Sequence, residues 1–153
     1  MISNQEVGLA RPTDVQRIAA MSRDLIEFGL GWKWTSRRIL HCVHNPVMNV
    51  AVAREHDRVT GFAIMQYLED EAHLVLFAVD AAHRRRGIGS ALLAWLEKTA
   101  RTAGIGIVYL EARLRNRGAR EFYRTHGYVE TGILHGHYRG IEDGVRIARD
   151  LWS

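Results

Sequence analysis

The fold is decided by residues 74–110, which read LVLFAVDAAHRRRGIGSALLAWLEKTARTAGIGIVYL. Residues 73–79 are almost continuously apolar, which is typical of a strand buried on both faces of a sheet. Residues 87–101 predict a helix, because apolar positions recur there at the helical period. Residues 105–111 predict a second buried strand, parallel to the first and joined to it by a right-handed crossover. The expected core stripe of the helix is Ile88, Leu92, Trp95, Leu96 and Thr99.

Further helices and strands are predicted around this strand–helix–strand unit. A first helix is expected after a cap at Thr13 or Asp14 and is expected to end near Gly29 and Gly31. A second, short helix is expected between a cap at Thr35 or Ser36 and the stop at Asn45 and Pro46, and a further one at residues 118–125 before Gly127. Strands are expected at residues 47–54, 59–67, 128–133 and 145–151, with turns at 55–58 and 69–71 and a loop at 134–144. Because no linker or internal repeat interrupts the pattern, residues 1–153 are expected to form one domain.

Composition narrows the class of protein. The chain has 153 residues, of which 47% are hydrophobic and 25% charged, values that fit one compact globular domain. A single cysteine, Cys42, excludes a disulfide scaffold and argues against a structural zinc finger. Residues 1–10 lack the basic and apolar segments of a secretory signal, and no apolar run is long enough to span a membrane. We therefore expect a soluble, cytoplasmic protein.

Arginine carries almost all of the positive charge. The 21 basic residues exceed the 17 acidic ones, and Lys33 and Lys98 are the only lysines. The arginines cluster in two places, Arg84–Arg86 and the set Arg113, Arg115, Arg117, Arg120 and Arg124. Guanidinium groups suit phosphates, whereas an arginine-rich helix face is commonly just solvated. The first cluster therefore indicates a phosphate-bearing ligand, while the second has solvation as its simplest explanation.

The first arginine cluster leads directly into a helix start that contains two glycines, Gly87 and Gly89. The first amide groups of a helix lack intrahelical partners, and the helix dipole adds about half a positive charge there, so they attract an anion. The missing Cβ atoms would let a phosphate approach the backbone. A Walker loop is excluded because no lysine follows, and a dinucleotide fingerprint because Leu92 stands at the third glycine position. A purely structural helix start is the alternative.

Two motifs carry a resemblance to a known family. The stretch AVDAAHRRRGIGSALLAWLEKTA, residues 78–100, resembles the acetyl-CoA-binding motif of the GNAT superfamily of N-acetyltransferases. A second set resembles the ribosomal-protein alanine N-acetyltransferase branch of this superfamily, namely Leu110, Glu111, Arg113, Asn116, Ala119, Tyr123, Gly127 and Tyr128. Ala81, Ala112 and Arg115 depart from the usual residues of that branch. The resemblance implies an α/β fold with a mixed, mostly antiparallel central sheet, a parallel acetyl-CoA-binding unit and helices on both faces.

The resemblance also implies that acetyl-CoA is the acyl donor, and it assigns residues to this cosubstrate. Strand backbone at Phe77, Ala78 and Val79 would accept the pantetheine arm as an extra half-strand. The pyrophosphate would be held by Arg84, Arg85, Arg86, Gly87, Ile88, Gly89 and Ser90, although Ser90 is expected mainly to support the helix start. Asn116 would bond the pantetheine arm, and its alternative role is the N-cap of the helix that follows.

Two side chains are candidates for proton transfer. By resemblance Tyr123 stands beside the thioester sulfur, where a phenol with an unperturbed pKa of about 10 suits protonation of the departing thiolate. A buried helix aromatic is the alternative for Tyr123. Glu111 is the candidate base for the acceptor amine, directly or through water, and an ion pair with Arg113 or Arg115 is its alternative. Transfer is expected to be direct, because the only thiol lies in the early helical region.

The expected acceptor is a primary amine, either a protein N-terminus or a small molecule, and the expected assembly is a monomer or a homodimer. Tyr138 is expected near the amine entrance, while Trp32 and Trp34 fit either core or acceptor contacts. His135 and His137 lack a convincing third ligand, so no metal is expected. The alternatives from another class are a non-catalytic acyl-CoA-binding module and a nucleic-acid-binding module, the latter recognisable by steeply salt-dependent DNA binding.

Overall fold

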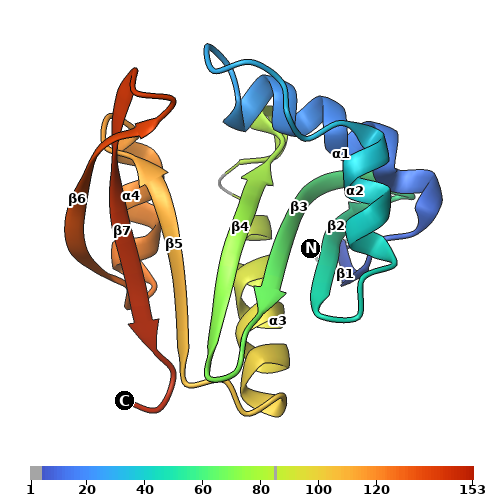
Figure 1. Cartoon of the computed structure of the whole chain (residues 1–153). Coiled ribbons are helices and arrows are strands. Elements are labelled where there is room, and N and C mark those ends of the chain that lie inside the picture. The colour runs from blue at the N-terminus through green and yellow to red at the C-terminus, as the bar shows by residue number, and fades with distance from the viewer. Residues whose placement is uncertain (1–4, 85) are drawn as a thin grey trace.

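The structure, a computed structural model, describes residues 5–84 and 86–153, and a single seven-stranded sheet runs through it (Figure 1). The strands are β1 (Gln5–Leu9), β2 (Met48–Glu55), β3 (Arg58–Tyr67), β4 (Glu71–Val79), β5 (Ile107–Arg113), β6 (Val129–Tyr138) and β7 (Glu142–Asp150). Their order across the sheet is β1-β2-β3-β4-β5-β7-β6. Only β4 and β5 pair in parallel, since the other described pairs are antiparallel. The predicted mixed, mostly antiparallel sheet is confirmed.

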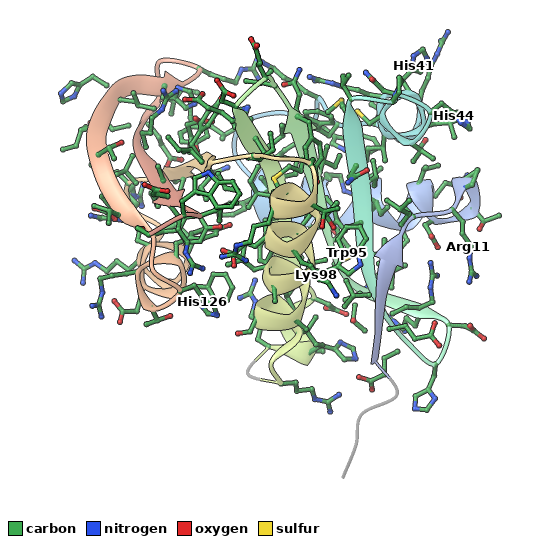
Figure 2. The ribbon with its side chains drawn as sticks, turned by 90° about the horizontal axis from the view of Figure 1, so that it is seen from below. Arg11, His41, His44, Trp95, Lys98 and His126 are labelled. Atoms are coloured by element: carbon green, nitrogen blue, oxygen red, sulfur yellow. The ribbon has the colours of Figure 1, made fainter. Side chains whose placement is uncertain are left out.

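Helices cover both faces of this sheet, as predicted. They are α1 (Val15–Met21), α2 (Ser36–Val43), α3 (Ile88–Thr102) and α4 (Arg117–Thr125), with a π-helical turn, Ser22–Ile26, that extends α1. Helices α1 and α2 pack on one face, and α3 and α4 on the other. Figure 2 shows His126, at the end of α4, on the side of α3 and away from His41 and His44 of α2. No helix within the described ranges is long and apolar enough to cross a membrane.

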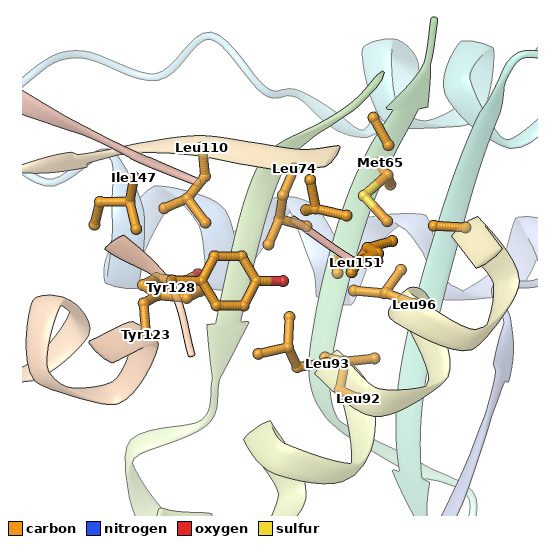
Figure 3. Packing of buried hydrophobic residues seen from close by; sticks show 14 of the residues in the cluster. Met65, Leu74, Leu92, Leu93, Leu96, Leu110, Tyr123, Tyr128, Ile147 and Leu151 are labelled. Carbon is orange, nitrogen blue, oxygen red and sulfur yellow. The ribbon is translucent and has the colours of Figure 1, made fainter. Parts of the chain in front are cut away.

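Two apolar clusters hold these layers together. The cluster between α3, α4 and the sheet contains Met65, Leu74, Leu92, Leu93, Leu96, Leu110, Tyr123, Tyr128 and Ile147 (Figure 3). Fully burying a leucine or isoleucine side chain contributes about 1.5–3 kcal/mol, so this cluster fixes α3 across the parallel pair. The predicted core stripe is confirmed for Ile88, Leu92 and Leu96, and Trp95 packs against the cluster while remaining half-buried. Thr99 is only half-buried, whereas Leu93 and Ala100, which the stripe did not include, are buried. The face of α3 that packs on the sheet is therefore slightly rotated from the face that the spacing of its apolar residues predicted.

The parallel pair is short and then separates. Its register pairs are Glu71↔Ile107, Ala72↔Val108 and His73↔Tyr109. Beyond His73, β4 continues beside β3, and beyond Tyr109, β5 continues beside β7. The prediction that residues 73–79 are buried on both faces is wrong, because buried and half-buried positions alternate along β4. The half-buried positions Val75, Phe77 and Val79 border the cavities described below.

Two other differences from the sequence-based expectation have local causes. Strand β1 was not predicted, because its five residues contain Gly8 and show no apolar alternation. The expected loop at residues 134–144 is instead the continuation of β6 and β7 into a tight hairpin. Arg139 and Gly140 make its turn, with φ values of +58° and +72°. The sequence of this hairpin did not indicate strands, because its residues are polar and both of its faces are largely exposed to solvent.

Candidate active site

A cavity of about 480 Å³ opens at the carboxyl end of β4, between the start of α3 and helix α4. Small-molecule sites in proteins commonly have volumes in this range. The predicted site residues that line the cavity are Phe77, Ala78, Val79, Arg84, Gly87, Ile88, Gly89, Ser90, Asn116 and Tyr123. The structure therefore brings together predicted site residues that are up to 46 residues apart in the sequence, from Phe77 to Tyr123, around one cavity.

The glycine loop forms one end of this cavity. Gly87 immediately precedes α3 and has φ +77°, in the left-handed region that favours glycine. The amides of the first helical turn that follows have no partners earlier in the helix. Gly89 is small for a different reason, because a Cβ there would lie 3.1 Å from the ring of Phe122. The two glycines therefore shape the turn at the start of α3 and allow α4 to pack against it.

The three arginines before the loop are not equivalent. Arg84 lines the cavity. Arg86 is exposed, is not among the lining residues, and places its guanidinium 3.4 Å from the carboxylate of Glu55. Arg85 lies outside the described residues. The lining also includes His83, which the sequence analysis did not single out and whose Nδ1 lies 3.2 Å from Asp80.

A second, smaller cavity of about 110 Å³ adjoins the first. It lies between β4, β5 and the segment that follows α1, and it includes Glu111, Arg113 and Tyr138. The two cavities share Leu25, Phe77, Asn116, Ala119 and Tyr123 in their linings. A group bound in the larger cavity and a group bound in the smaller one would therefore meet beside Tyr123.

Tyr123 is held in place by aromatic contacts on α4 and β4. Its ring lies 5.2 Å from that of Phe122 and 6.0 Å from that of Phe77, both in edge-on arrangements. Burial raises the pKa of the phenol well above its usual value, with a smaller contribution from Tyr138. Among the described residues its hydroxyl has no hydrogen-bond partner. Tyr123 is therefore a buried phenol with a raised pKa in the wall that the two cavities share.

Asn116 is the N-cap of α4, which is the alternative role that the sequence predicted for it. Its side-chain oxygen accepts a hydrogen bond of 3.1 Å from the amide of Ala119 and so caps the N-terminus of α4. The same residue lines both cavities. The cap fixes the side chain and leaves its amide nitrogen as the group available to a ligand.

Glu111 lines the smaller cavity, and its ion-pair partners differ from the expected ones. The expected alternative, a pair with Arg113 or Arg115, is wrong. Instead Glu111 Oε1 lies 2.6 Å from Nε2 of His73, and Oε2 accepts from Arg146 at 3.3 Å. The reason is strand geometry, because Glu111 and Arg146 are direct register partners on β5 and β7.

Arg113 ties the segment after α1 to the end of β5. Its guanidinium donates to the carbonyl oxygens of Ile26 and Phe28, at 2.8 and 2.6 Å. It also pairs with Glu142 at 3.2 Å and lies 4.2 Å from the centre of the Phe28 ring. With five donors in a rigid fork, one arginine satisfies all of these partners. Within the second arginine cluster, Arg113 is thus a structural residue of β5, whereas Arg115, Arg117 and Arg124 are exposed, as solvation predicts.

Comparison with known proteins assigns a family to this arrangement. Residues 19–128 match the acetyltransferase (GNAT) family. The chain belongs to the GNAT family.

Relatives of this GNAT chain include proteins with assigned names. It is 38% identical over 95 residues to the [ribosomal protein bS18]-alanine N-acetyltransferase of Salmonella typhimurium, covering 60% of this chain and 64% of that protein. It is 32% identical over 140 residues to N-alpha-acetyltransferase RimI of Mycobacterium tuberculosis, covering 87% and 84%. The match thus spans slightly less than two thirds of the Salmonella protein. The crystal structure of the ribosomal-protein-S18-alanine N-acetyltransferase from Escherichia coli superimposes with a TM-score of 0.83 at 25% identity, covering 96% and 94%.

Several residues of the GNAT site were not found by sequence reasoning. Leu25 and Phe28 enter from the segment after α1, whose path depends on tertiary contacts. His73 and Arg146 reach Glu111 from the neighbouring strands. The signal that was available for His73 is its position as a histidine at the start of an otherwise apolar strand. Trp32 and Trp34, in contrast, line neither cavity.

The remaining polar candidates have local roles in this GNAT fold. The hydroxyl of Ser90 lies 2.8 Å from Nε2 of His126, which links the start of α3 to the end of α4. His135 lies 3.6 Å from Asp143 at the β6–β7 hairpin. Within the described ranges no three histidine, cysteine or carboxylate side chains gather as a metal site. Cys42 is buried, as predicted.

Proposed function

We propose that this chain transfers the acetyl group of acetyl-CoA directly to a primary amine, with the N-terminal α-amine of a protein as the preferred acceptor. The observation that carries the proposal is the position of Tyr123 in the wall shared by the two cavities. The names of the Salmonella and Mycobacterium relatives support the acceptor class. Membership of the GNAT family does not favour the alternative of a non-catalytic or nucleic-acid-binding module.

In this proposal the larger cavity takes the donor. The first-turn amides after Gly87, together with Arg84, bind the pyrophosphate, because the helix start is electropositive and unpaired there. The edge of β4 from Phe77 to Val79 faces the cavity beyond the last pair with β5, and it offers backbone groups to the pantetheine amides. Asn116 adds one side-chain amide, and Arg86 is left with a supporting role at the rim.

The smaller cavity takes the amine. Glu111 accepts a proton from the incoming ammonium group, directly or through water, and the resulting neutral amine attacks the thioester. Tyr123 then donates its proton to the leaving sulfur. A cavity of about 110 Å³ favours a small first residue on the acceptor. The expected cytoplasmic location and the expected monomer or homodimer stay predictions.

The function is tested by mass spectrometry with acetyl-CoA and a panel of acceptors. We expect acetylation of a peptide with a free N-terminal alanine, and none of the same peptide with a blocked N-terminus and an internal lysine. An α-amine is roughly one-fifth neutral at about pH 7.4, whereas a lysine is roughly one-thousandth neutral. Polyamines in the same panel test whether the acceptor is a small-molecule amine instead. Absence of acetyl-CoA binding at millimolar concentration rejects the proposal.

The glycine loop gives a prediction with a matched control. Gly87 and Gly104 lie at opposite ends of α3, have φ values of +77° and +82°, and have open space where a Cβ would stand. Replacing either one by valine should lower the free energy of unfolding by about 1–2 kcal/mol, because both positions are left-handed. Only Gly87→Val should also raise the Kd for acetyl-CoA, by about 10-fold, which corresponds to about 1.4 kcal/mol.

Calorimetric titration of acetyl-CoA into each glycine variant measures the two Kd values. Equal acetyl-CoA affinity in Gly87→Val and Gly104→Val would show that the loop conformation does not contribute to donor binding.

A further inference from the structure

The carboxylate of Glu111 is held from two sides. Oε1 accepts from Nε2 of His73 at 2.6 Å, and Oε2 accepts from Nη2 of Arg146 at 3.3 Å. The Glu111 side chain is only 12% exposed, so the part of it that borders the smaller cavity has little freedom to rotate. Arg146 is half-exposed and its contact is longer. His73 is therefore the closer and better-fixed of the two partners.

His73 is itself fixed by its place in the sheet. It forms the last register pair of the parallel ladder, opposite Tyr109, before β4 and β5 separate. Its ring stacks on the ring of Tyr109 with the centroids 4.6 Å apart and the planes 4° from parallel. Stacking and strand pairing together hold the imidazole at the point where the cleft begins. The remaining β4 residues beyond it are apolar, so strand formation does not require a histidine here.

The charges around this pair favour the ionised carboxylate. Burial raises the pKa of Glu111, but the hydrogen bond and charge of His73 and the charges of Arg146 and His137 outweigh it, so the pKa lies below its usual value. The other titratable groups that face the pair are Tyr109 of β5, Tyr138 of β6 and Glu71 of β4. Burial, followed by the charge of Glu111, raises the pKa of Tyr138 to about 12, so that phenol stays neutral. Each further positive charge beside Glu111 makes it a weaker base.

We propose that His73 is a positioning residue of the acetyl transfer: its Nε2–H holds the carboxylate of Glu111 toward the acceptor amine. The inference rests on the proposed function. Histidine is suited to this task because its ring N–H is a hydrogen-bond donor on a short, planar side chain that stacking on Tyr109 keeps in place.

The proton count is complete without a further reactant. An N–H bond of the ammonium group breaks and an O–H bond forms at Glu111, directly or through one water. The amine lone pair forms the bond to the acetyl carbon, the carbon–sulfur bond breaks, and the sulfur takes the proton of Tyr123. Of the two protons left on the nitrogen, one restores Tyr123 and the other stays on the product amide. Glu111 returns its proton to solvent, so one proton is released per turnover. His73 takes no proton from the substrate and acts through Glu111.

The test compares His73→Leu, His73→Gln, Glu111→Gln and the double variant His73→Leu/Glu111→Gln in the full chain. At pH 8, His73→Leu should lower kcat by about 10-fold to 100-fold, the loss expected when a reacting group is misplaced by about 1 Å. The KM for acetyl-CoA should not change, because His73 does not line the larger cavity. His73→Gln should retain most of kcat, since its side-chain amide also offers an N–H group to the carboxylate. In the Glu111→Gln background, His73→Leu should have no further effect.

The kinetic constants separate positioning from mere stability. A positioning role predicts a lowered kcat with an unchanged KM for acetyl-CoA in His73→Leu, and recovery of kcat in His73→Gln, whereas a loss of folded protein would not be reversed selectively by a hydrogen-bond donor. Thermal unfolding and acetyl-CoA titration of each variant verify that it is folded.

Each outcome has a defined meaning. If the wild type acetylates no amine, the proposed function fails. If the wild type is active but His73→Leu keeps its kcat, or His73→Leu lowers kcat equally in the Glu111→Gln background, the role of His73 is refuted while the function stands. Should His73→Leu fail to fold, His73→Gln decides the proposal, because a loss of kcat of more than 10-fold in this variant would overturn it.

Discussion

Replacing Tyr123 by phenylalanine is expected to lower kcat for acetyl transfer by about 100-fold or more, the contribution usual for a positioned general acid. The ring packs edge-on against Phe122 and Phe77, and phenylalanine keeps these contacts, so only the hydroxyl is lost. Burial raises the pKa of Tyr123, so the wild-type donor stays protonated through neutral and mildly alkaline pH. Steady-state kinetics with saturating acetyl-CoA measure the effect.

Tyr128 supplies the matched control for this variant. Its ring lies 5.5 Å from that of Tyr123, but its hydroxyl donates to the buried carboxylate of Glu97 at 2.8 Å and it lines neither cavity of the site. Tyr128→Phe should cost about 1–3 kcal/mol of stability, because it leaves a buried acceptor short of a partner, and should leave kcat unchanged at a temperature where the variant is folded. If the two variants had the same kcat, Tyr123 would not be the acid.

The second large effect is expected on the stability of the fold, and it involves an ion pair outside the candidate active site. Arg54 and Asp14 form a buried, two-pronged ion pair with contacts of 2.9 and 2.7 Å that joins β2 to the start of α1. Arg54→Met should lower the free energy of unfolding by about 3–5 kcal/mol, because it leaves the Asp14 carboxylate buried without its partner. For a chain of this length the melting temperature should fall by roughly 10 °C. Calorimetry or thermal circular dichroism measures it.

The stability effect should depend on pH in a defined direction. The hydrogen bond from Arg54 lowers the pKa of Asp14 despite burial, so the pair stabilises the fold above the unfolded-state value of about 3.9 and loses this contribution as the pH falls through the folded-state value. The difference between wild type and Arg54→Met should therefore shrink in strong acid. Glu121→Gln, which breaks an exposed pair with Arg124, is the control and should leave the melting temperature unchanged. A similar loss in both variants would contradict the argument.

The elements with strong local signals could be predicted from the sequence. The apolar period of α3 and the two glycines at its start predicted the parallel unit, and this unit places its carboxyl end beside the larger cavity. The pattern Asn116 to Tyr123 predicted α4, including Asn116 as its possible cap. These features depend on residues close in the chain, so spacing alone carries the information.

What could not be predicted depends on pairing between distant strands. The partners of Glu111 come from β4 and β7, and nothing in the local sequence states which strands flank β5. The short strand β1 is formed by pairing with β2 rather than by its own propensity. Phe28 reaches the smaller cavity because Arg113 holds the neighbouring carbonyl oxygens, a contact between residues far apart in the chain. Contacts between residues far apart in the chain thus determine the partners of Glu111, the formation of β1 and the position of Phe28.

The brief contact between β4 and β5 also leaves part of a strand edge open inside the sheet. Because these strands share register pairs only at residues 71–73 and 107–109, the backbone of β4 beyond His73 is paired with β3 alone. An extended ligand that occupies this edge therefore competes with no strand of the protein. It can bind and leave without breaking a hydrogen bond of the sheet.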